Sequence, residues 1–174
     1  MNTQEECQEL LLQDVVRIDF VPPTALKIGI PFSIPNITSV AVTMSDDSAL
    51  TDAKLFAASL LSLNTTGDAT ADAEMQESTS CKVAQKLVVA GMVRTHSVQA
   101  AIEVGFQAIR EKEAALHAAD FHLVLTTADG IRYLAYALPG STSFSMEEQM
   151  GDAAQMSVKA SVQSMSGLIR ILES

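Results

Sequence analysis

The most informative stretch of the hydrophobic pattern is residues 121–138, where two β-rich runs flank Asp129-Gly130. Asp-Gly between such runs favours a hairpin, because a two-residue type I′ turn needs positive φ at both central residues. This turn gives the following cross-strand pairs: Leu125 with Leu134, Leu123 with Tyr136, and Phe121 with Leu138. We therefore predict an antiparallel hairpin with one wholly apolar face. The other face is mixed and open to a second covering layer; it carries His122, Val124, Thr126, Tyr133, Ala135 and Ala137.

Other alternating runs predict strands before and after this hairpin. They cover residues 15–20, 26–32, 38–44, 82–95, 155–163 and 168–172. The cleanest alternation is in the run 155–163. Its apolar side carries Met156, Val158, Ala160 and Val162. Pro22 ends the first of these strands, and Pro31 confines the second to a sheet edge or shortens it.

Helical spacing of apolar residues occurs in three segments. They are a short amphipathic segment at residues 2–13, residues 50–63 after a capping Ser48, and residues 97–117 after a capping Ser97. Residues 64–80 are rich in Thr, Ala, Asp and Gly and hold almost no bulky apolar residue. We interpret this segment as a mobile loop that is longer than most connections.

Many strands and one long helix place the chain in the mainly β (α+β) class. We expect an antiparallel β-sandwich or barrel with one flanking helix. A doubly wound parallel fold would need regular strand–helix alternation, which the sequence lacks. At 174 residues the chain is most simply one domain, residues 1–174, with 64–80 as its mobile loop.

The charge of the chain excludes some partners. A formal net charge of −10 and a pI near 4.6 argue against phosphate-backbone binding, and no Lys/Arg cluster is present. The same acidity disfavours docking on anionic lipid. No apolar run approaches the length of about 18 residues that a membrane span needs. We therefore expect neither a nucleic-acid partner nor a membrane partner.

Two cysteines, Cys7 and Cys81, are too few for a disulfide framework. We expect two unrelated thiols, with a single bridge between them as the alternative. The first residues, Met-Asn-Thr-Gln-Glu-Glu, are acidic where a signal peptide is basic, and no apolar core follows. The sequence therefore predicts a cytoplasmic location where the protein is made.

Candidate chemistry is sparse. The three histidines, His96, His117 and His122, end a strand, end a helix and start the hairpin, so a shared metal geometry is not expected. Two pairs of adjacent acids occur, 46–47 and 147–148, and we interpret them as solvated turn residues rather than as an acid/base pair. No phosphate loop and no GxSxG motif is present. We predict no catalytic, cofactor-binding or metal-binding residue, no cofactor and no enzymatic activity.

The predicted strands carry small or uncharged residues on the side away from the core. They include Ser157, Ser161, Gln163, Ala135, Ala137, Ala84 and Ala90. Surfaces with few Lys and Glu resemble interfaces, and methionine suits adaptable contacts or fills a core. The late methionines are Met146, Met150, Met156 and Met165. These features favour a subunit that associates with itself into a homo-oligomer, since a sheet of this type is prone to edge pairing.

The C-terminal half resembles the phage tail-tube proteins and related secretion-tube subunits. The resemblance is one of element order: the strand 82–95, the helix after Ser97, the Asp129-Gly130 hairpin, and paired late strands at 156–163 and 168–172. It implies a non-enzymatic assembly subunit in a ring or tube, alone or with other assembly proteins. It further implies that residues 144–151 form a loop against a neighbour, and that the protein is a virion or tail-like particle component.

Two other classes of function stay open. One is a β-barrel or sandwich that binds a small apolar ligand or a protein partner as a monomer, and this function predicts a closed apolar cavity with a few polar groups. The other is an enzyme whose site is assembled from distant residues, for which replacing His96 or His122 abolishes an activity.

Overall fold

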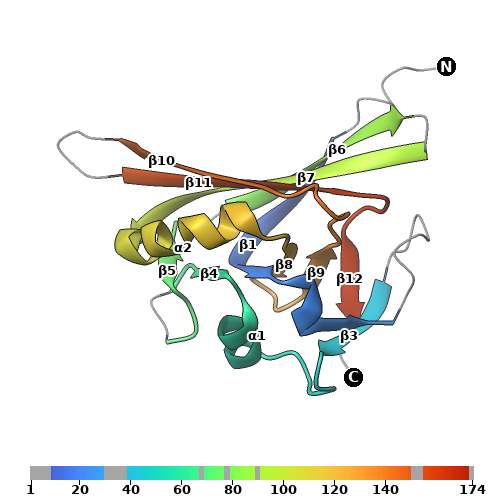
Figure 1. Ribbon diagram of the computed structural model, residues 1–174, viewed down its shortest axis with the longest axis horizontal. Coiled ribbons are helices and arrows are strands. Elements are labelled where there is room, and N and C mark those ends of the chain that lie inside the picture. Colours follow the sequence, from blue (N-terminus) through green and yellow to red (C-terminus); the bar gives the residue numbers. More distant parts are fainter. Residues whose placement is uncertain are drawn as a thin grey trace.

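The computed structural model describes residues 9–29, 39–66, 69–76, 79–88, 91–149 and 155–172. The described part is mainly β, as the sequence predicts: one curled mixed sheet forms a half-barrel, with two helices beside it (Figure 1). The strands are β1 (Glu9–Val21), β2 (Leu26–Ile28), β3 (Ser39–Met44), β4 (Leu61–Asn64), β5 (Ala73–Met75), β6 (Thr79–Val88), β7 (Gly91–Val104), β8 (His122–Thr127), β9 (Arg132–Ala135), β10 (Ser143–Gln149), β11 (Gln155–Ser164) and β12 (Ile169–Leu172). The helices are α1 (Asp52–Ala58), α2 (Phe106–Ala118) and the 3-10 helix η2 (Pro23–Ala25).

Strand β1 connects two parts of the sheet, because its N-terminal half and its C-terminal half pair with different strands. Residues 9–15 pair with β6, and the C-terminal half pairs with β4 on one side and β8 on the other. A bulge separates the halves where Asp14 adopts a φ of 59°. The sheet is mixed rather than purely antiparallel, since β12 pairs with β3 and β4 pairs with β5 in parallel.

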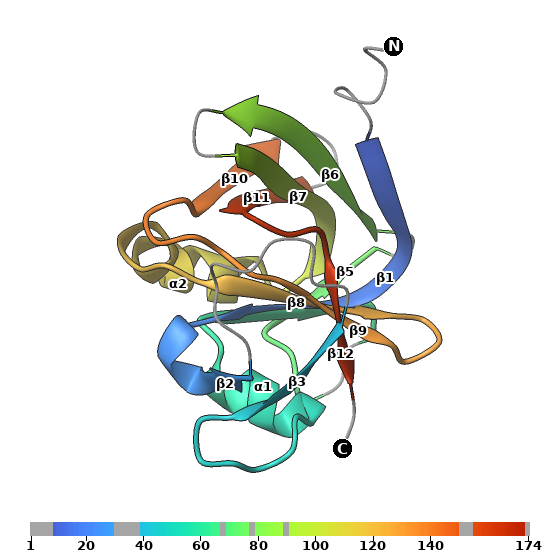
Figure 2. The ribbon, with the colours of Figure 1, turned by 90° about the vertical axis from the view of Figure 1, so that its right-hand side faces the viewer.

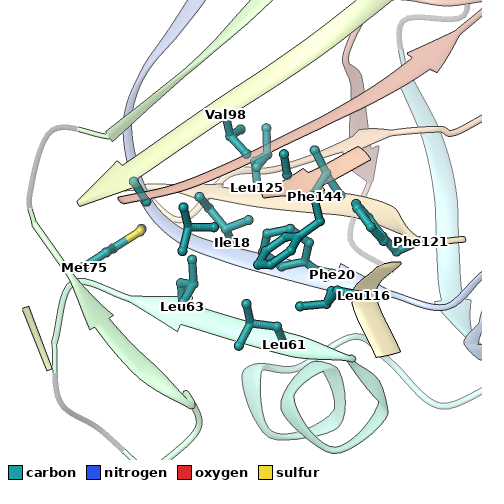
Figure 3. Packing of buried hydrophobic residues seen from close by; sticks show 14 of the residues in the cluster. Ile18, Phe20, Leu61, Leu63, Met75, Val98, Leu116, Phe121, Leu125 and Phe144 are labelled. Atoms are coloured by element: carbon teal, nitrogen blue, oxygen red, sulfur yellow. The ribbon is translucent and has the colours of Figure 1, made fainter. Parts of the chain in front are cut away.

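Two apolar cores lie on opposite faces of β1 and β8. Core 1 contains Phe20, which makes edge-to-face contacts with Phe121 (5.2 Å between centroids) and Phe144 (5.8 Å) (Figure 3). Core 2 lies under α1, whose Leu55 is fully buried there. Each such side chain contributes roughly 1.5–3 kcal/mol by its burial.

The hairpin at Asp129-Gly130 is present, but its register differs by one residue from the prediction. Only Gly130 has positive φ, and the amide of Thr127 donates to the carbonyl of Ile131 at 2.9 Å, so residues 128–130 form the loop. Leu125 therefore pairs with Tyr133 and Leu123 with Ala135. A shift of one residue moves every side chain of one strand to the other face.

The register shift changes which residues of β9 enter each core. Ala135 and Ala137 lie in core 1, whereas Leu134 lies in core 2. The predicted wholly apolar face with Leu134 and Tyr136 is therefore wrong. The expectation that the second face is covered is confirmed, because all six residues of β8 are buried.

Two of the predicted helices, 2–13 and 50–63, need correction. Residues 9–13, predicted as helix, belong to β1, and residues 1–8 lie outside the described residues. The predicted helix 50–63 is α1 followed by β4, whose four residues are all buried. A short run that is apolar on both sides has no period that separates strand from helix.

The predicted strand 82–95 consists of two antiparallel strands, β6 and the start of β7. Strand β7 then continues through Val104, so Ser97 lies in a strand and caps no helix. Helix α2 begins after Gly105, whose φ is 100°. A Cβ at this glycine would lie 2.7 Å from the Cα of Ala73, which explains the need for glycine there.

Two predicted loops contain strands. Within 64–80, β5 pairs with β4 and β7, and its Met75 is fully buried, while residues 79–80 begin β6. Residues 143–149 form β10 rather than a loop. The late strands β11 and β12 exist as predicted, but each pairs with other strands: β11 with β10 and β7, β12 with β9 and β3.

Candidate functional site

A buried ion pair joins β1 to its surroundings on the core 2 face. Arg17 is 1% exposed, and its guanidinium donates to both carboxylate oxygens of Asp19 at 2.9 and 3.0 Å. Ser62 donates from its hydroxyl to Asp19 at 2.6 Å. Arg17 also donates to the carbonyl of Thr70 at 2.6 Å and to that of Asp52 at 3.3 Å. We call these five residues the Arg17 network.

Two further ion pairs extend the Arg17 network toward solvent. Asp52 accepts from Arg132 at 2.7 Å, and Asp72, which accepts from the amide of Ser62, is paired with Lys112 at 2.7 Å. With Arg17 and Asp19, these pairs comprise three basic and three acidic groups, so their formal charges cancel. Burial raises the pKa of Asp19, although Arg17 and Ser62 oppose this shift.

The Arg17 network fastens α1 and residues 70–72 to β1, and its chemistry is that of a structural tie. Ser62 is fully buried and its hydroxyl is already donated to Asp19, so it is no exposed nucleophile. Sequence reasoning missed this cluster. The available signal was the placement of two charges, Arg17 and Asp19, between apolar Ile18 and Phe20 in a strand.

The three histidines lie in different environments. His96 lies within β7, where its Nε2 donates to the carbonyl of Ser166 at 3.1 Å and its buried Nδ1 has no partner. His122 accepts a hydrogen bond at Nδ1 from the amide of Ala137 at 2.9 Å. Burial lowers the pKa of both imidazoles to about 4. His117 is exposed near the C-terminus of α2.

The adjacent acids also lie in separate places. Asp46 accepts hydrogen bonds from the amide and the hydroxyl of Ser48, which lower its pKa, and Asp47 pairs with exposed Lys27 at 2.6 Å. These two acids form a turn, as predicted. Glu148 pairs with Arg110 of α2, whereas Glu147 lies on the opposite side of β10 and has no ion pair with a described residue. Neither pair forms a two-carboxylate site.

One part of the sheet is an antiparallel layer of five strands, in the order β10, β11, β7, β6 and residues 9–15 of β1. We call this layer the outer sheet; Figure 2 shows it in the upper half of the molecule. One face of it buries core 1 through Phe144, Ala160 and Val98, which lie side by side on neighbouring strands.

The opposite face of the outer sheet is uncharged over most of its described residues. Its side chains are Thr95, Ser97, Gln99, Ala101, Ser143, Ser145, Ser157, Ser161 and Gln163, with Glu103, Glu147 and Lys159 as the charged members. Ser157, Ser161 and Gln163 thus lie on the surface that sequence reasoning assigned to them, and the first two are half-buried.

Other residues assigned to that surface lie elsewhere. Ala135 and Ala137 are buried in core 1, so their assignment to a contact surface is wrong. Met156 also belongs to core 1, Met146 packs against it, and Met165 is half-buried. Nothing is described of the side chains of Ala84 and Cys81, although both belong to β6. Residues 7, 90 and 150 lie outside the described residues.

The outer sheet ends in two strand edges. Strand β10 pairs with β11 alone among the described residues, which leaves its other side as an edge, the β10 edge. Within the part of the chain that the structure describes, residues 9–13 of β1 pair with β6 alone, because pairing of β1 with β8 starts only at Val15. The side of residues 9–13 away from β6 is the β1 edge. Each edge presents backbone N–H and C=O groups that a further strand can bind.

Comparison of the chain with protein-family models, with curated proteins and with solved structures finds no match. In the described residues, no helix combines the length and apolar character needed to cross a membrane.

Proposed function

We propose that this protein is a non-enzymatic assembly subunit that associates with copies of itself into a ring or tube. The observation that carries the proposal is the β10 edge: seven residues, Ser143–Gln149, which among the described residues pair on one side only. Unpaired edge strands are templates for a strand from another chain.

Strand β10 lacks most of the devices that protect a sheet edge. It contains no proline, and its pairing with β11 runs without a bulge from Ser143 to Gln149. Edges in monomeric proteins are commonly short, bulged, covered, or marked by lysine or proline. The two charges of β10 are Glu147 and Glu148, and Arg110 neutralises the second. The β10 edge is therefore open to pairing.

The face of the outer sheet supports the same proposal. Its small and uncharged side chains lose little hydration and little rotamer entropy when another copy approaches, compared with a surface of Lys and Glu. Lys159 is the only cation among its described side chains.

The test compares two serine-to-lysine variants by size-exclusion chromatography with light scattering. Ser145→Lys places a charge on the edge strand, opposite Lys159, whereas Ser97→Lys places one on β7, opposite Lys82. Both positions are exposed, and only the first belongs to an edge. We expect wild type and Ser97→Lys to form one discrete oligomer at micromolar concentration, and Ser145→Lys to shift toward the monomer.

Two outcomes would count against the proposal. A wild-type protein that remains monomeric at high concentration contradicts self-association and favours the monomeric binding protein instead. Equal dissociation of both variants would show that assembly does not use the β10 edge.

A further inference from the structure

The directions of the strands at the two edges point to one way of joining copies. Along the outer sheet each strand is antiparallel to the next, from β10 through β11, β7 and β6 to β1. Because four antiparallel steps separate them, β10 and β1 run in the same direction. A copy rotated about an axis along the strands therefore brings its β1 edge beside the β10 edge with the two strands parallel.

On the basis of the proposed self-association, we propose that the β10 edge of one copy pairs in parallel with the β1 edge of the next copy. Residues 9–13 are the segment of β1 that lies beyond its pairing with β8, so a neighbour meets this backbone without displacing a described strand. Repetition of this head-to-tail contact joins the outer sheets into one continuous sheet. Heterologous contacts of this kind close into rings, or form open helical filaments where the rotation does not close.

The register within the outer sheet supports this junction. Rows of paired residues cross all five strands: Phe144, Ala160, Val98, Cys81 and Leu12 form one row. Both end members of this row, Phe144 and Leu12, contact core 1. In this row the core-facing side is thus apolar at both edges, and a joined sheet continues this apolar row from one copy to the next.

The main competing arrangement is a two-fold dimer in which β10 pairs with the β10 of another copy. If all seven residues of β10 pair in this dimer, Met146 of one copy lies opposite Met146 of the other. The Glu147 residues of the two copies are then diagonal neighbours across the junction. Like charges at neighbouring cross-strand positions are unfavourable. Two-fold pairing also leaves the β1 edge unpaired, whereas the head-to-tail junction covers both edges with one contact.

Hydrogen exchange with mass spectrometry on wild-type protein separates these arrangements. Dilute and concentrated samples are compared peptide by peptide, after light scattering has established the oligomer. We expect backbone amides in both residues 9–13 and residues 143–149 to exchange at least about tenfold more slowly in the oligomer. Residues 91–104 of β7, already paired on both sides over most of their length, serve as the internal reference.

Each result has a defined consequence. Protection of residues 143–149 alone supports the two-fold dimer and overturns head-to-tail pairing, while self-association stands. An oligomer that protects neither segment also overturns it. A wild-type protein that is monomeric throughout overturns both the pairing and the proposed function.

A mixing experiment gives an independent readout. Ser145→Lys blocks the β10 edge and Leu11→Lys blocks the β1 edge, so each variant retains one open edge. Head-to-tail pairing predicts that each is a monomer alone and that the mixture forms a one-to-one heterodimer. A two-fold β10 contact predicts that Leu11→Lys assembles alone and that mixing adds nothing. Circular dichroism confirms that both variants are folded.

Discussion

Strands β8 and β11 show how differently two parts of the same sheet are used. Every residue of β8 is buried, because core 1 and core 2 cover its two faces. Strand β11 buries only alternate residues, Met156, Val158, Ala160, Val162 and Ser164, and the described residues of its other face are exposed or half-buried. Substitutions around β8 should therefore affect stability, whereas substitutions on the polar side of the outer sheet should affect association.

The largest expected effect is at the buried ion pair beside β8. Asp19→Asn removes the buried carboxylate that contacts the Arg17 guanidinium at 2.9 Å and leaves only the longer contact, 3.8 Å, with the more exposed Asp52, which costs about 3–5 kcal/mol. The matched control is Asp47→Asn in the exposed pair with Lys27, for which about 0–1 kcal/mol is expected. Urea unfolding measures both free energies. Equal losses in the two variants would contradict the structural role of the Arg17 network.

Acid should destabilise the protein through His96 and His122. Burial lowers the pKa of each folded imidazole to about 4 from the ordinary value of 6.5. Because the folded pKa is depressed, the unfolded chain binds protons first, and stability present above pH 6.5 is lost as pH falls toward 4. The expected loss is about 3 kcal/mol for each histidine.

The free energy of unfolding, measured between pH 7 and pH 4, tests this pH dependence. His96→Gln should flatten the curve by the contribution of one histidine. A slope that neither His96→Gln nor His122→Gln alters would contradict the burial of these imidazoles.

The hairpin register is tested by enlarging one alanine. Ala135 is fully buried in core 1, so Ala135→Leu should overpack that core and cost about 1–3 kcal/mol. Ala101→Leu adds the same side chain to the exposed face of β7 and should change stability by less than about 0.5 kcal/mol. Thermal unfolding that shows no difference between the two variants would favour the alternative register, with Leu134 in core 1.

The smallest effect is expected at an exposed ion pair between α2 and the outer sheet. Arg110→Ala removes the partner of Glu148, and both side chains are more than one third exposed, so the loss of stability should be far smaller than that of Asp19→Asn. Chemical denaturation of Arg110→Ala and of Asp19→Asn measures the free energy of unfolding that each variant loses. If Arg110→Ala lost as much free energy of unfolding as Asp19→Asn, the exposed ion pair and the buried ion pair would contribute equally to stability. That result would contradict the contrast between β8 and the outer sheet.

The same contrast explains which elements could be predicted from the sequence. The one-sided burial of β3 and β11 is visible as alternation, so both strands and their buried residues were predicted correctly. Strand β4 and strand β5 are short and buried between neighbours, and the sequence has no period there. Strand β7 was mistaken for a helix after residue 97 because Ser, Ala and Gln occupy its exposed positions and do not oppose a helical spacing.

The candidate site was harder to predict than the fold. The polar residues of β11 were recognised as a surface, but the edges of the outer sheet depend on which strands are neighbours. That information is non-local: β1 and β6 are far apart in sequence, as are β7 and β11. The predicted register of the β8–β9 hairpin was wrong for a local reason. Asp129-Gly130 also fits a longer loop, in which only Gly130 needs positive φ.

Self-association into a ring or tube is tested most directly by electron microscopy of the purified protein at micromolar concentration. The account predicts closed rings or stacked tubes of uniform diameter, which Ser97→Lys retains and Ser145→Lys loses. A field of single particles of monomer size for the wild-type protein would contradict it.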